Sequence, residues 1–329
     1  MSDVGLLPDD AVGILDVLLS VLLLGMVLLI VAVPDRRAQV GGFLGLGAVL
    51  SGVWLRLGSV DVALAEAALG GGVLSAILVW LVLADRRIPG RPVDGKPLRA
   101  PGWLKAGTGV LSGAAITVVL GSVVLRARQA GPQWPQSLSA EMAGTGVAHD
   151  ITAVLLAFRA YDTLLESAVL LFSGIVALAL SGDTPPPARK VRLPSVFKWL
   201  VSVAAPVLLI LGLWLLFVGS SDSGGAFQSG AVFAGLLILL RLAGIRLPLL
   251  QRLLVPLLIV GVVVFVGMGL VGPLAGEPWL TWVGGQPFLM IFTIEVFLTL
   301  GITSGLYLLY LALADPGQRI STAAGERKV

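Results

Sequence analysis

Long apolar segments recur along the chain, and the short stretches between them hold most of the charged residues and prolines. A helix needs about 20 residues to cross a hydrocarbon layer of about 30 Å. Strands of this length would leave unpaired edges in lipid. We therefore predict an all-α, polytopic integral membrane protein with about nine transmembrane helices. The predicted spans are Val12–Val33, Val40–Leu57, Val60–Leu83, Leu104–Leu125, Thr163–Leu180, Phe197–Val218, Ala226–Ala243, Leu253–Val271 and Phe288–Ala314.

The composition agrees with this prediction and excludes several kinds of chemistry. Apolar residues make up 57% of the chain and charged residues 12%, and the mean hydropathy is +0.99. Soluble proteins carry about 25% charged residues, so we expect a multi-pass protein of the cell (cytoplasmic) membrane. The chain has no cysteine and one histidine, His149, so we expect no metal centre and no cofactor. The net charge of +3 requires no nucleic-acid partner.

The distribution of basic residues predicts the orientation. If the N-terminus lies outside, 18 of the 22 Lys and Arg residues fall on the inner side, as expected for cytoplasmic loops. The C-terminus is then cytoplasmic. Two inner loops rich in Pro, Gly and Arg divide the chain, Ala84–Pro101 and Ser181–Pro194. The resulting parts, 1–88, 102–182 and 195–315, contain three, two and four predicted spans.

Several acidic residues fall within predicted spans, where a charge is costly and often functional. Asp16 lies one turn inside the first span, and we interpret it as half of a static ion pair. At 1.5 Å per residue, Glu66 and Glu295 lie roughly 9 to 10 Å from the outer ends of their spans. Asp162 and Glu166 are four residues apart and share one helical face. For Glu66, Glu166 and Glu295, a structural and a functional role are both open.

Two further charged residues lie outside the spans. Arg159 precedes Asp162 by three residues, so the two are predicted to form an ion pair. His149 belongs to an amphipathic segment, Val147–Phe158, which we expect to lie as a helix at the outer interface. Because histidine changes its charge near neutral pH, His149 would extend an ion entrance there. A merely solvated histidine is the alternative.

Glycines form a second pattern. The segment Gly224-Gly-Ala-Phe-Gln-Ser-Gly230 precedes the seventh span. Its glycines suit a turn, and the helix N-terminus would offer N–H groups to an anion or a carbonyl. A plain tight turn is the alternative. Glycine pairs four residues apart predict close helix packing rather than chemistry, and these pairs are Gly41/Gly45, Gly109/Gly113 and Gly301/Gly305.

Three motifs resemble parts of Mrp-type multisubunit Na⁺/H⁺ antiporters and of the related membrane-bound hydrogenases. Asp61-Val-Ala-Leu-Ala-Glu66 with Gly70-Gly-Gly72 resembles the hydrogenase D subunit, with a counterpart in the C-terminal part of the antiporter A subunit. Phe158-Arg-Ala-Tyr-Asp-Thr-Leu-Leu-Glu166 resembles the hydrogenase E subunit. Ser223-Gly-Gly-Ala-Phe-Gln-Ser-Gly230 resembles the antiporter B subunit, whose hydrogenase counterpart is the F subunit. The motifs follow the order of the family, one in each part of the chain, as if three subunits were fused.

The resemblance implies an accessory subunit of a cation/proton antiporter-type complex, with no enzymatic activity of its own. Its implied partners are lipid, large antiporter-like subunits and a small C-type subunit. The implied transported ions are Na⁺ or H⁺. The ion or proton pathway is predicted to comprise Asp61, Glu66, His149, Asp162, Glu166 and Glu295. The residues predicted to shape the motifs are Arg159, Gly224, Gly225, Phe227, Gln228 and Gly230.

Two other functions are compatible with the sequence. A purely structural scaffold of a redox-linked or other energy-converting complex would tolerate neutralisation of the embedded acids. A self-sufficient secondary transporter would ordinarily contain internal repeats, and parts of three, two and four spans show none. The broken helices and buried lysines of the large antiporter-like subunits are also missing, so we expect the chain to need partners.

Overall fold

The computed structural model describes residues 13–85, 102–130, 141–180, 195–245, 247–282 and 287–314. Within these ranges the chain forms helices and turns and contains no strand. Seven helices are long and apolar enough to cross a membrane, and two shorter apolar helices occur at Gly107–Val123 and Ala226–Leu242. These helices lie at the positions of the predicted spans, so the chain is an all-α, multi-pass membrane protein. The orientation and the number of crossings stay predictions.

The chain divides into two units, one of residues 1–86 and 142–329 and one of residues 87–141. The described part of the second unit consists largely of helix α5 (Gly102–Ala130). No atom lies within 4 Å of the side-chain positions of Gly109 and Gly113 on this helix, so the packing predicted for that pair does not occur within the described residues. Most of the predicted linker Ala84–Pro101 and all of Ser181–Pro194 lie outside the described residues.

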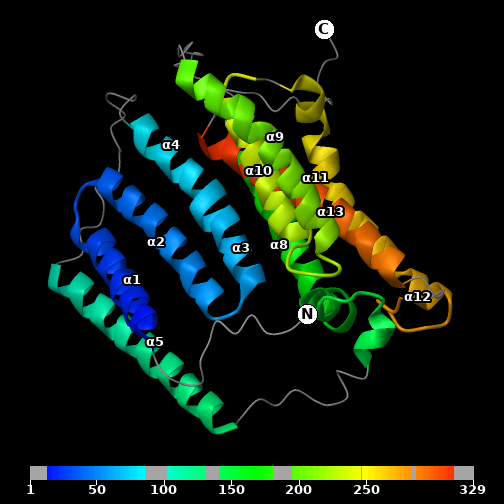
Figure 1. Cartoon of the computed structure of the whole chain (residues 1–329), viewed down its shortest axis with the longest axis horizontal. Helices are drawn as coiled ribbons and strands as arrows, with labels where there is room; N and C mark the ends of the chain where they lie inside the picture. The colour runs from blue at the N-terminus through cyan, green and yellow to red at the C-terminus, as the bar shows by residue number, and fades with distance from the viewer. Residues whose placement is uncertain are drawn as a thin grey trace. The chain divides into compact units, whose positions relative to one another are not determined.

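The first unit begins with an antiparallel pair of helices, α1 (Ile14–Ala32) and α2 (Arg36–Arg56) (Figure 1). An ion pair ties the start of α1 to the end of α2, because Arg56 Nε lies 2.8 Å from Asp16 Oδ1. A second guanidinium nitrogen, Nη2, donates to Asp16 Oδ2 over 3.1 Å. The static ion pair predicted for Asp16 is therefore present.

The third predicted span is not a uniform α-helix. It consists of α3 (Val60–Ala68), the π-helical turn η1 (Leu69–Leu74) and α4 (Ser75–Asp85). The π turn contains Gly70, Gly71 and Gly72, and Ser75 Oγ donates to the carbonyl oxygen of Gly70. Sequence hydropathy alone does not distinguish a π turn from an α-helix, so this interruption was not predicted.

The remaining long helices pack around α13 (Pro287–Ala314), which crosses the centre of the group (Figure 1). They are α8 (Ala160–Leu180), α9 (Ser195–Val218), α10 (Ala226–Leu242) and α11 (Pro248–Gly269). The core includes Phe265, Ile291 and Ile294, none of which is exposed at all. Because α13 is apolar on all sides and surrounded by other helices, it is the most buried of the spans.

Glycines set the closest helix approaches on α13. A side chain at Gly230 of α10 would lie 2.7 Å from Cγ2 of Ile302. A side chain at Gly305 would lie 3.0 Å from Leu170 of α8, and one at Gly301 would lie 3.6 Å from a carbonyl oxygen of α11. The packing predicted for Gly301 and Gly305 is confirmed. By contrast, Gly41 of α2 has no atom within 4 Å of its side-chain position.

Short elements cover one end of this helix group. They are η2 (Ala143–Thr145), α7 (Asp150–Ala153), the π turn η3 (Val154–Phe158) and α12 (Val271–Leu274). The helix expected over Val147–Phe158 therefore begins later, and its second half is π-helical. Leu156 of η3 is buried, and its carbonyl oxygen accepts a hydrogen bond of 2.7 Å from Trp282 Nε1. One side of this segment therefore packs against other parts of the first unit, to which the segment belongs.

Candidate functional site

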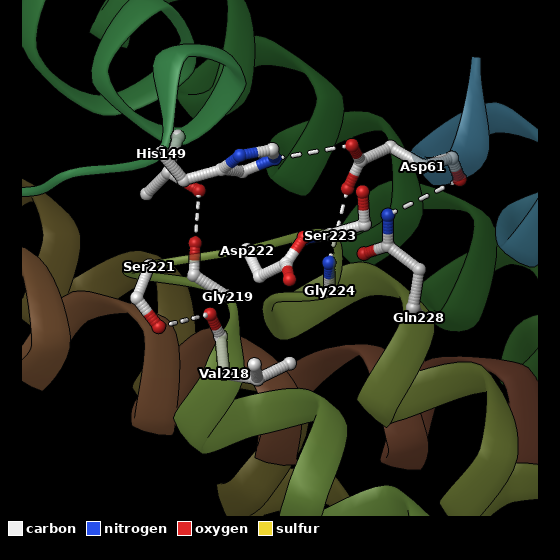
Figure 2. Close-up of polar contacts among 10 residues, drawn as sticks. Asp61, His149, Val218, Gly219, Ser221, Asp222, Ser223, Gly224 and Gln228 are labelled. Carbon is white, nitrogen blue, oxygen red and sulfur yellow. Dashed lines mark hydrogen bonds and ion pairs between the residues drawn. The ribbon is translucent and has the colours of Figure 1, made fainter. Parts of the chain in front are cut away.

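Asp61, in the first turn of α3, joins three segments that are far apart in the sequence (Figure 2). Its carboxylate oxygen Oδ2 lies 3.1 Å from His149 Nε2. Its other oxygen, Oδ1, accepts a hydrogen bond of 3.0 Å from the backbone N–H of Gly224. Its main-chain carbonyl accepts from Gln228 Nε2 over 3.3 Å. Asp61 is only 6% exposed, so these contacts satisfy a buried charge-bearing group. We call Asp61, His149, Gly224 and Gln228 the Asp61 junction.

Backbone contacts hold His149 in place at the junction. The N–H groups of Ala148 and His149 both donate to the carbonyl oxygen of Ser220, over 2.9 and 3.1 Å. One turn later, the hydroxyl of Thr152 donates to the carbonyl oxygen of Gly219. The segment before α7 is therefore fixed to the α9–α10 loop along its length. The imidazole is positioned rather than simply solvated, since the His149 side chain is 15% exposed.

The α9–α10 loop needs its glycines. A side chain at Gly224 would lie 2.5 Å from the carbonyl oxygen of Leu215, too close for any other residue. Gly225 has φ +107°, a conformation that L-residues with side chains rarely adopt. Its N–H donates to Leu215 O over 2.8 Å, which folds the loop back onto the end of α9. This sharp turn presents the Gly224 N–H to Asp61 and starts α10 beside it.

The rest of the motif packs the start of α10. Phe227 contributes to the cluster of apolar side chains around Ile291 and Leu298 of α13. Ser229 donates from its hydroxyl to the carbonyl oxygen of Gly212 in α9, over 2.7 Å. Together with Gly230, which allows close contact with α13, these residues fix α10 between its neighbours. The predicted structural residues of the motif therefore all take part in one turn and one helix start.

Glu295 of α13 lies beside the same turn. It is 2% exposed, and its oxygen Oε2 has no hydrogen-bond partner among the described residues. Its other oxygen lies 3.1 Å from the position that a Gly225 side chain would occupy, and Gln228 Oε1 lies 3.8 Å from that position. Within α13, the carbonyl oxygen of Glu295 accepts a hydrogen bond of 2.8 Å from Thr299. Glu295 therefore adjoins the Asp61 junction through Gly225 and Gln228.

Glu66 belongs to a separate place on the same span. It is half-buried, and its carboxylate covers Gly70 of η1, where any side chain would collide with it. The same oxygen lies 3.4 Å from the side-chain position of Gly47 in α2. Glu66 thus occupies the seam between α2 and η1, away from the hydrogen bonds that Asp61 makes. The two acids of this motif have different surroundings.

The acids of α8 lie outside the junction as well. Arg159 and Asp162 form the predicted ion pair, but their side chains are 69% and 49% exposed. Glu166, one turn further along α8, is also exposed. Within the described residues, Glu166 has no ion pair or hydrogen bond to the rest of the chain. The structure therefore brings Asp61 and His149 into contact and places Glu295 beside the turn at Gly225, whereas Asp162 and Glu166 lie elsewhere.

The partners of the junction in the α9–α10 loop were missed by the sequence analysis. Gly219 and Ser220 accept hydrogen bonds through their backbone carbonyls, so their side chains carry little information. The available signal was the polar, glycine-containing run from Gly219 to Gly225 between two long apolar spans. Such a run predicts a loop but does not identify what the loop contacts.

The junction places a buried carboxylate in contact with an imidazole and a backbone N–H. The buried carboxyl of Glu295 lies next to it. Among the described residues, no group of three His, Asp or Glu side chains is placed to hold a metal ion.

Comparison with protein families identifies two parts of the chain. Residues 21–87 match the MbhD family, described as the D subunit of MBH. Residues 196–312 match the MnhB family, described as "Domain related to MnhB subunit of Na+/H+ antiporter". The Asp61 motif falls in the first match, and Gly224–Gly230 and Glu295 fall in the second. Neither match covers residues 88–195, which contain His149 and the α8 acids.

The fold resembles a solved structure. One chain of "Structure of Mrp complex from Dietzia sp. DQ12-45-1b" superimposes with a TM-score of 0.70 and 21% sequence identity. The match covers 95% of this chain and 36% of the other, so this chain spans about a third of that chain's length. Comparison with curated proteins found no match. One segment of the chain therefore matches the MbhD family and another matches the domain related to the MnhB subunit of Na⁺/H⁺ antiporters, and the fold is similar to that of a chain of the Mrp complex.

Proposed function

We propose that the chain is an accessory membrane subunit of a multisubunit Na⁺/H⁺ antiporter-type complex. In this proposal it contributes part of an ion or proton pathway and a contact surface for antiporter-like subunits. The family matches at residues 21–87 and 196–312 support membership of such a complex. Its partners would be large antiporter-like subunits and a small C-type subunit, and the transported ions would be Na⁺ or H⁺.

The Asp61 junction is the observation that carries the pathway proposal. Asp61 from the first matched segment contacts Gly224 and Gln228 from the second, and His149 from the segment between them. A buried carboxylate that is bonded to the one histidine of the chain is suited to proton exchange near neutral pH. Glu295 extends the line of titratable groups inward from the junction. A scaffold would not require titratable groups at this place.

Glu66 and Glu166 would add two acids to the route at places away from the Asp61 junction. Glu66 lies in the seam between α2 and η1, and π turns inside α-helices occur frequently at functional sites. Glu166 and Asp162 lie on the outward face of α8, where water or another protein of the complex would surround them. The route would therefore be shared between this chain and its partners. This arrangement favours an accessory subunit over a self-sufficient transporter.

Transport by the assembled complex tests the proposal. We expect the double variant Glu66→Gln/Glu166→Gln to lose most cation-dependent proton exchange in inverted membrane vesicles, because glutamine keeps the shape and removes the charge. Glu277→Gln, an exposed acid outside the spans, is the matched control and should keep full exchange. Full exchange by the double variant in an assembled complex would support the scaffold function instead. Robust exchange by the chain alone in vesicles would support a self-sufficient transporter.

A further inference from the structure

Glu295 differs from every other acid described in the first unit, because it is buried and one of its oxygens has no partner. It is 2% exposed, and Oε2 has no hydrogen bond among the described residues. An ionised carboxylate buried in this way would carry a large desolvation cost. A neutral, protonated carboxyl avoids that cost. The burial and the missing partner therefore indicate a carboxyl that holds a proton.

The charged residues of the neighbouring helices do not supply a counter-ion. Lys198 in the first turn of α9, Arg241 in the last turn of α10 and Arg252 near the start of α11 are in the half of these helices away from the turn at Gly225. Helix α4 ends at Asp85, also at that other end. Arg241 lies 15 residues along α10 from Ala226, which corresponds to about 22 Å.

The nearer titratable groups are on the side of the Asp61 junction. Asp61 and His149 are held to each other, and the acids of α8, Asp162 and Glu166, face outward. Hard cations such as Mg²⁺ collect about six oxygen ligands. Among the described residues no group of three His, Asp or Glu side chains could hold a metal ion, and the oxygens nearest to the side-chain position of Gly225 are Glu295 Oε1 and Gln228 Oε1. A proton fits this sparse set of ligands better than a metal cation does.

The Gln228 side chain contacts the junction and also approaches the turn at Gly225, beside which Glu295 lies. Its amide nitrogen donates to the carbonyl oxygen of Asp61 over 3.3 Å, so its amide oxygen is turned the other way. That oxygen and Glu295 Oε1 lie 3.8 and 3.1 Å from the same point, the missing side chain of Gly225. An amide oxygen on this side suits a protonated Glu295, which would donate to it. An ionised Glu295 would instead attract the amide N–H₂ group and the N-terminal N–H groups of α10.

We propose that Glu295 is a proton-binding site and that the Gln228 side-chain amide couples its protonation to the Asp61–His149 pair. With the proton bound, Gln228 donates to Asp61 and holds the α3 backbone at the junction. When the proton leaves, the amide turns toward Glu295 and releases its bond to Asp61. When the proton leaves, the O–H bond of Glu295 breaks and an O–H bond to a water molecule forms, which leaves a carboxylate and a hydronium ion. Gln228 is therefore a positioning residue between two titratable sites.

This inference deepens the proposed function and rests on it, but its test does not measure transport. The full-length chain in lipid nanodiscs is studied by infrared difference spectroscopy between acid and alkaline pH. We expect a protonated-carboxyl C=O band that is lost in Glu295→Gln and kept, at a shifted frequency, in Glu295→Asp. The matched control Glu277→Gln, an exposed acid, should leave that band unchanged. Persistence of the band in a folded Glu295→Gln chain would overturn the proton site.

The coupling is tested through His149, the one histidine in the sequence, whose imidazole NMR signals need no assignment. At a fixed pH, we expect Glu295→Gln to move these signals in the wild-type background. The same substitution should have no effect in a Gln228→Leu background, because the connecting amide is gone. Equal changes in both backgrounds would overturn the role of Gln228.

Two further outcomes separate this inference from the proposed function. Loss of the band on adding Na⁺ at constant pH would show that Na⁺ displaces the proton and would overturn the assignment of the site to a proton alone. If Glu295→Gln removes the band while the assembled complex still exchanges ions fully, the proton site is correct and its part in the pathway is wrong. If exchange is lost while the band persists, the pathway proposal survives and this inference fails.

Discussion

Carboxylates occupy two contrasting regions of the molecule. In the Asp61 junction, both carboxylate oxygens have partners from the same chain, His149 Nε2 and the Gly224 N–H. On α8, Asp162 pairs only with its exposed neighbour in sequence, and Glu166 is exposed. An exposed carboxylate on a membrane-spanning helix is costly unless a partner or water surrounds it. The carboxylate of the first region is satisfied within this chain, whereas those of the second are exposed among the described residues.

The side chains next to Glu166 strengthen this contrast. Tyr161, Leu165 and Val169 of α8 are 59%, 62% and 66% exposed. Their exposure places Glu166 on a surface that the described residues do not cover. Substitutions in the junction should therefore affect the chain by itself, while substitutions on α8 should have their main effect in the complex. The following predictions test this difference, beginning with the largest expected effect.

Loss of the Asp61 carboxylate should destabilise the chain most. Asp61→Ala leaves the Gly224 N–H and the His149 imidazole without an acceptor in a buried place, which should cost about 3 kcal/mol of unfolding free energy. Titration with a denaturing detergent in mixed micelles measures this change. Asp162→Ala is the control and should cost less than about 1 kcal/mol. Equal losses in the two variants would remove the distinction between the regions.

The turn at Gly225 should be nearly as sensitive. Gly225→Ala must place a side chain at φ +107° and 3.1 Å from Glu295 Oε1, so we expect a loss of about 2 kcal/mol. The matched control is Gly235→Ala, in the helix that follows this turn, where no atom lies within 4 Å of the new methyl group. Because alanine favours helix, that control should stabilise the chain by about 0.5 kcal/mol. Changes of the same sign would contradict the role given to the turn.

The exposed ion pair of α8 should contribute little. A double-mutant cycle with Arg159→Gln and Asp162→Asn should give a coupling of about 0.5 kcal/mol in the isolated chain. The same cycle repeated at high salt should give a smaller value, because salt screens exposed charges. A coupling that is large and independent of salt would mean that the pair is shielded, and the outward position of this part of α8 would be wrong.

Neutralising Glu166 should have the smallest effect on the isolated chain. Glu166→Gln removes no contact within the described residues, so the unfolding free energy should change by less than about 0.5 kcal/mol. In the assembled complex, the same substitution should lower cation-dependent proton exchange. Measuring both properties for one variant tests directly whether Glu166 acts within this chain or in the complex. A strongly destabilised isolated chain would show that Glu166 has a partner within this chain after all.

The sequence predicted most of the helices because long apolar runs in a membrane protein have few alternatives. The predicted span Val12–Val33, for example, corresponds to α1, Ile14–Ala32. Details that depend on local backbone geometry were harder to predict from the sequence. The π turn within Val60–Leu83 was missed, and so were the late start and the π-helical second half of the Val147–Phe158 helix. Hydropathy depends on residue type, so it does not show whether a helix has the i→i+4 hydrogen bonds of an α-helix or the i→i+5 bonds of a π turn.

The sequence predicted which residues belong to the candidate site but not how they are arranged. Asp61, His149, Gly224 and Gln228 were all selected from the sequence, but their mutual contacts were not. Asp61 and Gly224 are 163 positions apart, and the helices between them are apolar on all sides. When a helix has no polar face opposite an apolar one, the sequence pattern does not fix its rotation about its own axis. For the same reason, the outward position of Glu166 was not predicted.

The order of synthesis gives the Asp61 junction a further consequence. Asp61 enters the growing chain 163 residues before Gly224, the residue that satisfies one of its oxygens. At translation rates of about 5 to 20 residues per second, this separation corresponds to a delay of roughly ten to thirty seconds. Throughout that interval the acidic group of Asp61 lacks the N–H group of Gly224 and the side chain of Gln228, which have not yet been made. The contacts of Asp61 in α3 therefore form only after the α9–α10 loop has been made. Folding of the first third of the polypeptide thus depends on the synthesis of the last third.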